Sequence, residues 1–194
     1  MIYSKKATSI GKYEMSEMIL QTPSSLLRPW SLNDRPSLVK HADCPEIAAS
    51  MRDGFPSPYT LADADRFLAM ATSDHPHLFM AVVVDDQAVG GIGIHLLVDI
   101  YRRSAEIGYW VSKPYWGRGI ISDAVCAILP IAFKNPDIIR IQAGVFSNNP
   151  GSMRVLEKNG FVLEAIHKKA ITKQGKILDE HLYVLFRDED SPEG

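Results

Sequence analysis

The clearest helical pattern in the chain covers residues 120–133. Apolar side chains recur there at positions 120, 121, 124, 125, 128, 129, 132 and 133, and this spacing lays one stripe along a helix. Glu106 to Val111 alternates as a strand does, and Lys113-Pro114 ends that strand because proline has no N–H for the ladder. Trp116-Gly117-Arg118-Gly119 stands between the two. The pattern therefore predicts a strand, a glycine-containing turn and a long helix.

Shorter patterns predict the remaining elements. Strands are expected at 24–30, 78–84, 88–98, 138–146, 161–170 and 176–186, and further helices at 34–41, 61–72 and 153–159. Asn33 or Asp34 is expected to cap the first of these helices, and Asn149, followed by Pro150, the last. This order predicts an α/β (α+β) fold with a central, mixed, largely antiparallel seven-stranded sheet flanked by about four helices.

Length and composition limit the class of protein. The 194 residues are 46% hydrophobic and 23% charged, which suits one ordinary globular domain over residues 24–187. Residues 1–23 are expected to form a flexible N-terminal extension, and residues 188–194 a disordered acidic tail. A net charge of −2 without a basic tract argues against nucleic-acid binding.

The chain shows no sign of export or of metal binding. No run is long enough to span a membrane, and the N-terminus lacks a signal-peptide pattern, so a cytoplasmic location is expected. Cys44 and Cys126 have neither metal-ligand spacing nor the pattern of a disulfide framework. The histidines have no mutual spacing for a metal either, and we expect none.

The two glycines before the long helix are the first indication of a binding site. Gly117 and Gly119 precede a helix whose free N–H groups and positive dipole end favour an anion. The turn is neither a P-loop nor a dinucleotide fingerprint, since G-x-x-x-x-G-K-[ST] and G-x-G-x-x-G are both absent. Three more glycines, at positions 90, 91 and 93, lie inside one predicted strand, so we expect a helix or a ligand to pack closely there.

The turn resembles the acyl-CoA loop of the GNAT superfamily of N-acetyltransferases, Q/R-x-x-G-x-G/A. Gly117 and Gly119 match its two small positions, whereas Pro114 stands where the family usually has Gln or Arg. The Tyr-Trp-Gly-x-Gly form resembles the RimJ/RimL branch, which is named for acetylation of ribosomal-protein N-termini. The same branch typically shows N-x-x-S-x-x-V-L-E-K-x-G-F, and Asn149 to Phe161 agrees with that pattern in register.

Weaker similarities extend the match upstream. Leu27 to Trp30 resembles the first strand of the branch, and Pro58-Tyr59-Thr60 its second helix entrance. The resemblance covers about Leu26 to Arg187. It implies one GNAT-like acetyltransferase domain whose sheet splays between the fourth and fifth predicted strands, with acetyl-CoA wedged into the gap. The residues expected to bind this cosubstrate are Trp110, Val111, Trp116, Gly117, Arg118, Gly119, Ile120, Ile121, Ser122, Asn149 and Ser152.

The implied chemistry is acyl transfer from a thioester to an amine, which needs a group to remove the proton of the ammonium. Glu106 is our first choice as base or amine anchor, against the alternative of a surface glutamate in an ion pair. Asp179 and Glu180 are the alternative candidates for this role. Asp179 and Tyr109 are also expected to contact the acceptor substrate.

Three further residues have both a possible functional role and a purely structural explanation. Ser152 is the candidate that returns a proton to the thiolate, but it also suits the first turn of a helix. Asn149 is expected both to cap that helix and, by the resemblance, to contact the pantetheine arm. Arg118 between the loop glycines is expected to meet the adenosine phosphates; otherwise it is a solvated arginine.

Three functions remain open at this stage. The first is an acetyl-CoA-dependent N-acetyltransferase that acts on a protein or peptide N-terminal amine. The second is the same chemistry on a small amine, such as a polyamine, an amino acid or an aminoglycoside. The third is a non-catalytic acyl-CoA sensor. The expected partners are acetyl-CoA and an amine acceptor, without nucleic acid or membrane, and the protein is expected to be a monomer or a homodimer.

Overall fold

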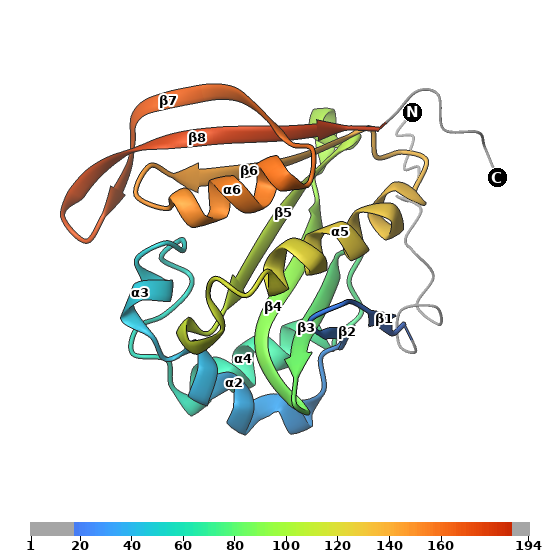
Figure 1. Ribbon diagram of the computed structural model, residues 1–194, viewed down its shortest axis with the longest axis vertical. Coiled ribbons are helices and arrows are strands. Elements are labelled where there is room, and N and C mark those ends of the chain that lie inside the picture. The colour runs from blue at the N-terminus through green and yellow to red at the C-terminus, as the bar shows by residue number, and fades with distance from the viewer. Residues whose placement is uncertain (1–17, 188–194) are drawn as a thin grey trace, which may run out of the picture.

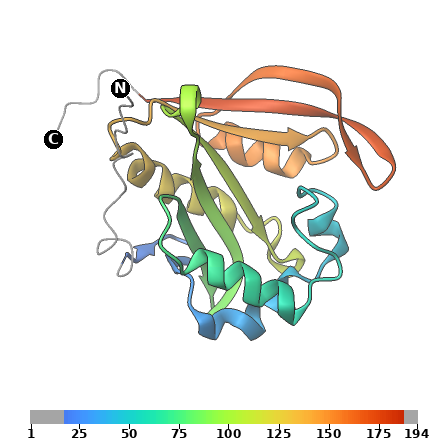
Figure 2. The same ribbon diagram turned by 180° about the vertical axis from the view of Figure 1, so that it is seen from behind.

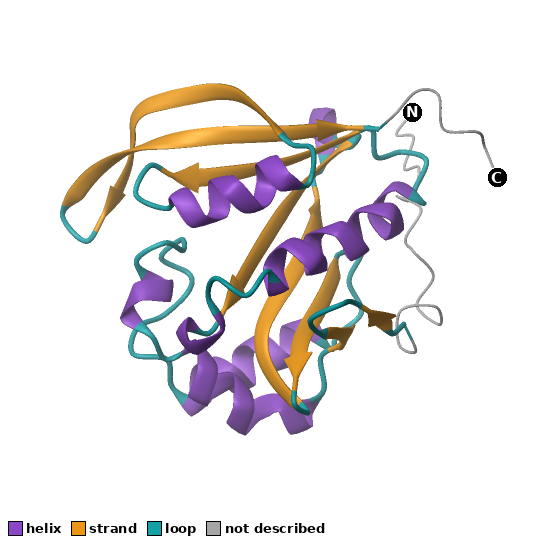
Figure 3. Cartoon of the chain, in the orientation of Figure 1, coloured by secondary structure: helices purple, strands orange, loops and turns teal. Residues whose placement is uncertain are grey.

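The computed structural model describes residues 18–187, and its strands form one eight-stranded sheet (Figures 1 and 3). The strands are β1 (Leu20–Gln21), β2 (Leu26–Pro29), β3 (Leu78–Val84), β4 (Gln87–Leu96), β5 (Ser104–Val111), β6 (Arg140–Phe146), β7 (Val162–Lys173) and β8 (Lys176–Phe186). The helices are α2 (Arg35–Ala42), α3 (Pro45–Ala48), α4 (Leu61–Ala71), α5 (Ile120–Phe133) and α6 (Pro150–Lys158), with 3₁₀ turns η1 (Leu32–Asp34), η2 (Asp99–Tyr101) and η3 (Lys113–Tyr115).

The predicted fold class is confirmed, with one strand more than expected. The strand order is β1-β2-β3-β4-β5-β6-β8-β7, and the β5–β6 pair is parallel while the other neighbours are antiparallel. The additional strand, β1, lies in the segment expected to be an extension. Two residues are too few to show a period, so no pattern could reveal it. The flexibility and disorder expected for residues 1–17 and 188–194 lie outside the described residues.

Helices cover both faces of the sheet, and β3 shows why. Leu78, Met80 and Val82 face the cluster that includes α5, whereas Phe79, Ala81 and Val83 face the cluster of α2 and α4. Successive side chains of a strand point to opposite faces, so a continuous apolar run is buried on both. Figure 2 shows α2 and α4 on the side away from α5. None of the helices in residues 18–187 is long and apolar enough to cross a membrane.

Two glycines of β4 make room for aromatic rings. A Cβ built on Gly93 would lie 2.7 Å from the Phe79 ring, and one on Gly91 would lie 3.0 Å from both Trp30 and Trp110. The close packing predicted at these positions is therefore present. The neighbours are aromatic side chains at Gly91 and Gly93 and the β5 backbone at Gly90, rather than the helix or ligand that we expected.

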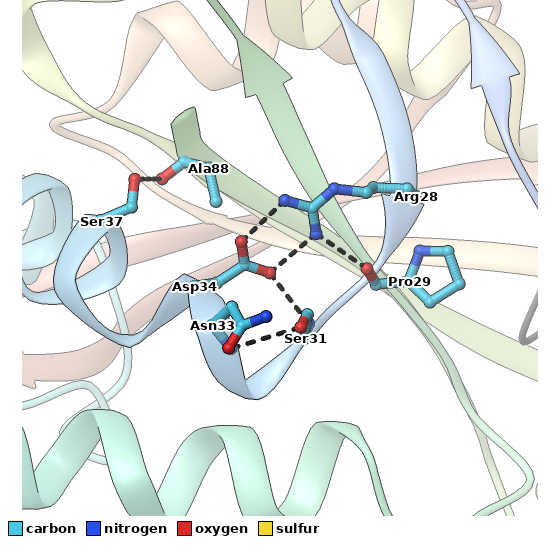
Figure 4. A network of polar contacts seen from close by, with 7 residues as sticks. All are labelled: Arg28, Pro29, Ser31, Asn33, Asp34, Ser37 and Ala88. Carbon is cyan, nitrogen blue, oxygen red and sulfur yellow. Dashed lines mark hydrogen bonds and ion pairs between the residues drawn. The ribbon is translucent and has the colours of Figure 1, made fainter. Parts of the chain in front are cut away.

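An ion pair fixes the entry to α2 (Figure 4). The Arg28 guanidinium donates to both carboxylate oxygens of Asp34 at 2.7 Å, and the backbone N–H of Ser31 donates to the same carboxylate at 2.9 Å. Ser31 is the N-cap of η1, and the Asp34 side chain completes a capping box. Asp34 stands at the N-cap position of α2, as predicted, with Pro36 in the first turn. Its side chain makes no capping hydrogen bond to α2, because the carboxylate binds Arg28 and the Ser31 N–H instead. Ser37 then ties α2 to β4 through the Ala88 carbonyl, at 3.1 Å.

Candidate active site

The sheet opens between β5 and β6, as predicted. The two strands pair only where Ser104–Glu106 lie beside Arg140–Gln142. Beyond this point β5 continues to Val111 and β6 to Phe146, and the two diverge (Figure 1). A cleft of about 1280 Å³ fills the opening. Of the predicted site residues it brings together Glu106, Tyr109, Trp110, Val111, Trp116, Gly117, Gly119, Ile120, Ile121, Ser122, Asn149 and Ser152.

The glycine turn has the backbone that its sequence requires. Gly117 has φ +74° and Gly119 φ +80°, both in the left-handed region that favours glycine. Gly119 is the N-cap of α5, so the first N–H groups of the helix have no intrahelical acceptor. The indole N–H of Trp116 donates to the Val111 carbonyl at 2.8 Å and folds the turn against the end of β5. The positive end of α5 therefore lies at the cleft.

Arg118 does not line this cleft. Its guanidinium lies over the Tyr115 ring, 5.1 Å from the centroid, and its side chain is exposed. The structure shows the solvated arginine of our alternative, held by a cation–π contact. Its orientation gives no support to the phosphate contact expected from the sequence.

A tyrosine–serine pair links the two walls of the cleft. The hydroxyl of Tyr109, on β5, lies 2.9 Å from the Ser152 hydroxyl, on α6. Burial raises the pKa of Tyr109 to about 12, so the phenol stays protonated at neutral pH. Asn149 Oδ1 accepts the Ser152 N–H at 3.1 Å, which confirms the predicted helix cap with Pro150 in the first turn. Two hydroxyl groups thus lie where the sheet opens.

Asn159 is a residue that sequence reasoning missed. Its side-chain amide donates to the Ser122 carbonyl at 3.2 Å and to the Val155 carbonyl at 2.8 Å. It joins the end of α6 to the first turn of α5. A lone asparagine before Gly160 looks like an ordinary helix terminus, so the sequence carried no signal for this contact.

Glu106 lies in the cleft as one arm of an ion pair. Arg52, from the loop after α3, donates to Glu106 Oε1 at 2.7 Å. The Glu106 side chain is 25% exposed and that of Arg52 74%, so the pair leaves the carboxylate accessible from the cleft. The ion pair that we gave as the alternative to a catalytic Glu106 is therefore present. It leaves the carboxylate in the cleft, so it is compatible with a catalytic role.

A histidine lies beside Glu106. His95 is opposite Glu106 in the β4–β5 register and lines the cleft. Partial burial lowers its pKa, and the neighbouring His77 adds to this, while the charge of Glu106 opposes it. A neutral imidazole next to a carboxylate is a second group able to accept a proton.

The two acidic candidates on β8 point in different directions. The Asp179 carboxylate accepts the Lys169 N–H at 2.8 Å and an N–H of the Lys168 ammonium at 2.9 Å, and these bonds lower its pKa. It does not line the cleft, so the contact expected between Asp179 and the acceptor is not supported. The bulge in β7, where Lys169 has φ +55°, presents that N–H to the carboxylate.

Glu180 takes the position expected of Asp179. It lines the cleft, its Oε2 lies 2.9 Å from His167 Nδ1, and its side chain packs over Gly144 of β6. A side chain at position 144 would collide with this carboxylate. The glycine inside β6 was the signal that could have indicated a side chain crossing the strand.

The fold and the site define an enzyme class. A splayed mixed sheet with a helix N-terminus, a hydroxyl pair and a carboxylate around one cleft suits acyl transfer from a thioester to an amine. Residues 25–162 match the family model described as Acetyltransferase (GNAT) domain. The chain belongs to the GNAT acetyltransferase family.

Individual relatives agree with this assignment. The chain is 33% identical to the probable N-acetyltransferase YjcK of Bacillus subtilis over 114 residues, 59% of this chain and 63% of that protein. It is 31% identical to the ribosomal-protein-serine acetyltransferase of Escherichia coli over 111 residues, 57% of this chain and 61% of that protein. The alignments thus span less than two thirds of these two relatives. The structure of Mycobacterium smegmatis RimJ in complex with CoA-disulfide superimposes with a TM-score of 0.75 and 26% identity, covering 91% of this chain and 88% of that one.

Family membership confirms the predicted enzyme class, an N-acetyltransferase, and its cosubstrate, acetyl-CoA. Likeness to ribosomal-protein acetyltransferases supports the predicted RimJ/RimL-type branch. Within residues 18–187 no group of three or more His, Cys, Asp or Glu side chains is arranged to hold a metal ion. The roles of the individual site residues, the acceptor and the oligomeric state stay predictions.

Proposed function

We propose that this protein transfers the acetyl group of acetyl-CoA to the α-amine of a protein or peptide N-terminus by direct attack. The observation that carries this proposal is a single open cleft that joins the N-terminus of α5, the Tyr109–Ser152 pair and the Glu106 carboxylate. A phosphate-binding end, a proton donor and a proton acceptor are thus available along one path. The similarity to the E. coli ribosomal-protein-serine acetyltransferase and to RimJ supports an N-terminal acceptor.

The cosubstrate would be held mainly by backbone. The N–H groups that begin α5 suit the pyrophosphate, and Gly117 and Gly119 allow its close approach. Residues 107–111 of β5 pair with β4 on one side, whereas the pairing of β5 with β6 ends at Glu106. The backbone groups on the open side suit the amides of the pantetheine arm. Bound acetyl-CoA supplies an activated thioester.

The reacting groups would share the proton transfers. Glu106, or the adjacent His95, removes a proton from the attacking amine. Ser152 gives a proton to the departing thiolate, and Tyr109, whose pKa of about 12 keeps it protonated, supports the serine through the 2.9 Å contact. No covalent enzyme intermediate is needed. These roles follow from position in the cleft and from ordinary acid–base chemistry.

One observation favours a small cationic amine instead. Two carboxylates, Glu106 and Glu180, line the cleft on different strands and would suit a polyamine or an aminoglycoside. Glu106 is already paired with the Arg52 guanidinium, and the Glu180 carboxylate lies in hydrogen-bond contact with His167, so both carboxylates already have partners within the protein.

An acceptor panel tests the proposal. Purified protein with acetyl-CoA is offered N-terminal peptides, free amino acids, polyamines and aminoglycosides, and CoA release is measured. We expect release with peptides, and a blocked N-terminus in the same peptide should abolish it. Release with polyamines or aminoglycosides alone would replace the proposal by the small-amine function. CoA binding without release for any amine would leave the sensor function.

A further inference from the structure

Two adjacent, oppositely charged residues of the α3–α4 loop bridge the cleft. Arg52 pairs with Glu106 of β5 at 2.7 Å, and Asp53 pairs with Lys173 at the end of β7, also at 2.7 Å. All four residues line the same cleft. The loop therefore carries one cation to one wall and one anion to the other.

The exposure of these four side chains is unequal. Arg52 is 74% exposed and Asp53 88%, whereas Glu106 is 25% exposed and Lys173 only 9%. Arg52 and Asp53 are largely solvated already, so their own charges lose little when they leave for solvent, and the cost of separation falls on their partners. A buried charge that loses its partner is strongly unfavourable. When an acceptor displaces the loop, Lys173 therefore requires another anion, and Glu106 another cation.

We propose that Arg52 and Asp53 occupy the charged positions of the acceptor in the empty enzyme. The acceptor is a peptide whose α-amine pairs with Glu106 and whose early acidic residue pairs with Lys173. Lys173 is thus a specificity-determining residue. This inference rests on the proposed function and adds to it a requirement for a carboxylate near the N-terminus.

The spacing favours a peptide over a free amino acid. Consecutive Cα atoms lie about 3.8 Å apart, and the Arg and Asp side chains extend further, so the two charges they present are on the order of 10 Å apart. In a free amino acid the amine and the carboxylate share one carbon atom and cannot reach both walls. An extended peptide advances about 3.3 Å per residue, which places the acidic side chain at the second to fourth position. A polyamine has no anion for Lys173.

Matched peptides test the role of Lys173. Hexapeptides that differ only in Glu or Gln at position two, three or four are compared by kcat/KM from CoA release. In the wild-type enzyme we expect one Glu peptide to exceed its Gln partner by roughly 10–100-fold. In Lys173→Met this ratio should fall to about one. Lys176→Met is the matched control, because Lys176 faces Lys173 across the hairpin and is exposed; it should keep the ratio.

Loop variants test the displacement. The double variant Arg52→Gln/Asp53→Asn removes both loop charges, and KM for the preferred Glu peptide should fall about two- to fivefold because the internal competitor is gone. Removal of another exposed ion pair, Arg35→Gln/Asp65→Asn, should leave KM unchanged. A KM that stays the same or rises in the loop variant overturns the displacement.

The possible failures are distinguishable. Equal rates for Glu and Gln peptides in the wild-type enzyme overturn the carboxylate requirement and leave peptide acetylation in place. A ratio that survives in Lys173→Met overturns the role of Lys173. Acetylation of spermidine without acetylation of any peptide overturns the proposed function together with this inference. Thermal stabilisation by CoA, measured for every variant, verifies that each remains folded and binds the cosubstrate.

Discussion

Substitution of Gly119 by glutamate separates the role of the glycine turn in binding from its role in folding. Gly119 has φ +80°, and a Cβ built there meets nothing within 4 Å. The substitution therefore causes backbone strain without a collision. A left-handed non-glycine residue costs about 1–2 kcal/mol, which lowers the melting temperature by about 2–8 °C for a chain of this size. The new carboxylate would also stand at the entrance to α5 and repel the pyrophosphate.

A second glycine provides the matched control. Gly175, in the β7–β8 turn, has φ +76° and also has open space around a built Cβ, and it does not line the cleft. Gly175→Glu should therefore lose similar stability and keep the cosubstrate site.

The assay is thermal unfolding with and without acetyl-CoA. Ligand at about 100 times its dissociation constant adds about 2.7 kcal/mol, or about 5–11 °C, to the wild-type protein. We expect the same gain in Gly175→Glu and no gain in Gly119→Glu. Equal gains in both variants would refute the anion site at α5, and no gain in the wild-type protein would refute acetyl-CoA binding itself.

Three further predictions concern the reacting groups and pH. Glu106→Gln should lower kcat/KM at neutral pH by roughly 10²–10⁴-fold if the carboxylate is the base. Activity should recover above pH 8, because an α-amine of pKa about 7.7–8.0 is then mostly neutral before it binds. A rise in KM alone, without recovery at high pH, would indicate that Glu106 binds the charged amine instead of removing its proton. Ser152→Ala should lower kcat by about tenfold or more. Tyr109→Phe should lower kcat less in the Ser152→Ala variant than in the wild-type enzyme, since the two hydroxyls act as one unit. Additive losses in the double variant would contradict this coupling. Burial lowers the pKa of His41, His77 and His95 below 6.5 in the folded protein. The unfolded chain therefore binds more protons, and the free energy of unfolding should fall as the pH drops below about 6.5. Equal free energies of unfolding from urea titrations at pH 7.5 and 5.5 would contradict this.

Local patterns in the sequence predicted the cosubstrate half of the site. The apolar stripe of α5, the two glycines before it and the Asn149-Pro150 cap each follow from residues close together in the chain. Helix period, left-handed backbone and capping are local physics, so one sequence is enough to specify them. The splay of the sheet followed from resemblance to a family, and the pairing that ends at Glu106 agrees with it.

Tertiary structure alone decided the acceptor half. Asp179 and Glu180 are neighbours, and only the bulge in β7 and the bare backbone of Gly144 determine which of them faces the cleft. Asp53 and Lys173 meet across 120 residues of sequence, and Arg52 reaches Glu106 from a loop without a periodic pattern. Such contacts depend on strand register and on the path of loops, which are set by packing between distant segments rather than by the residues next to them in the chain.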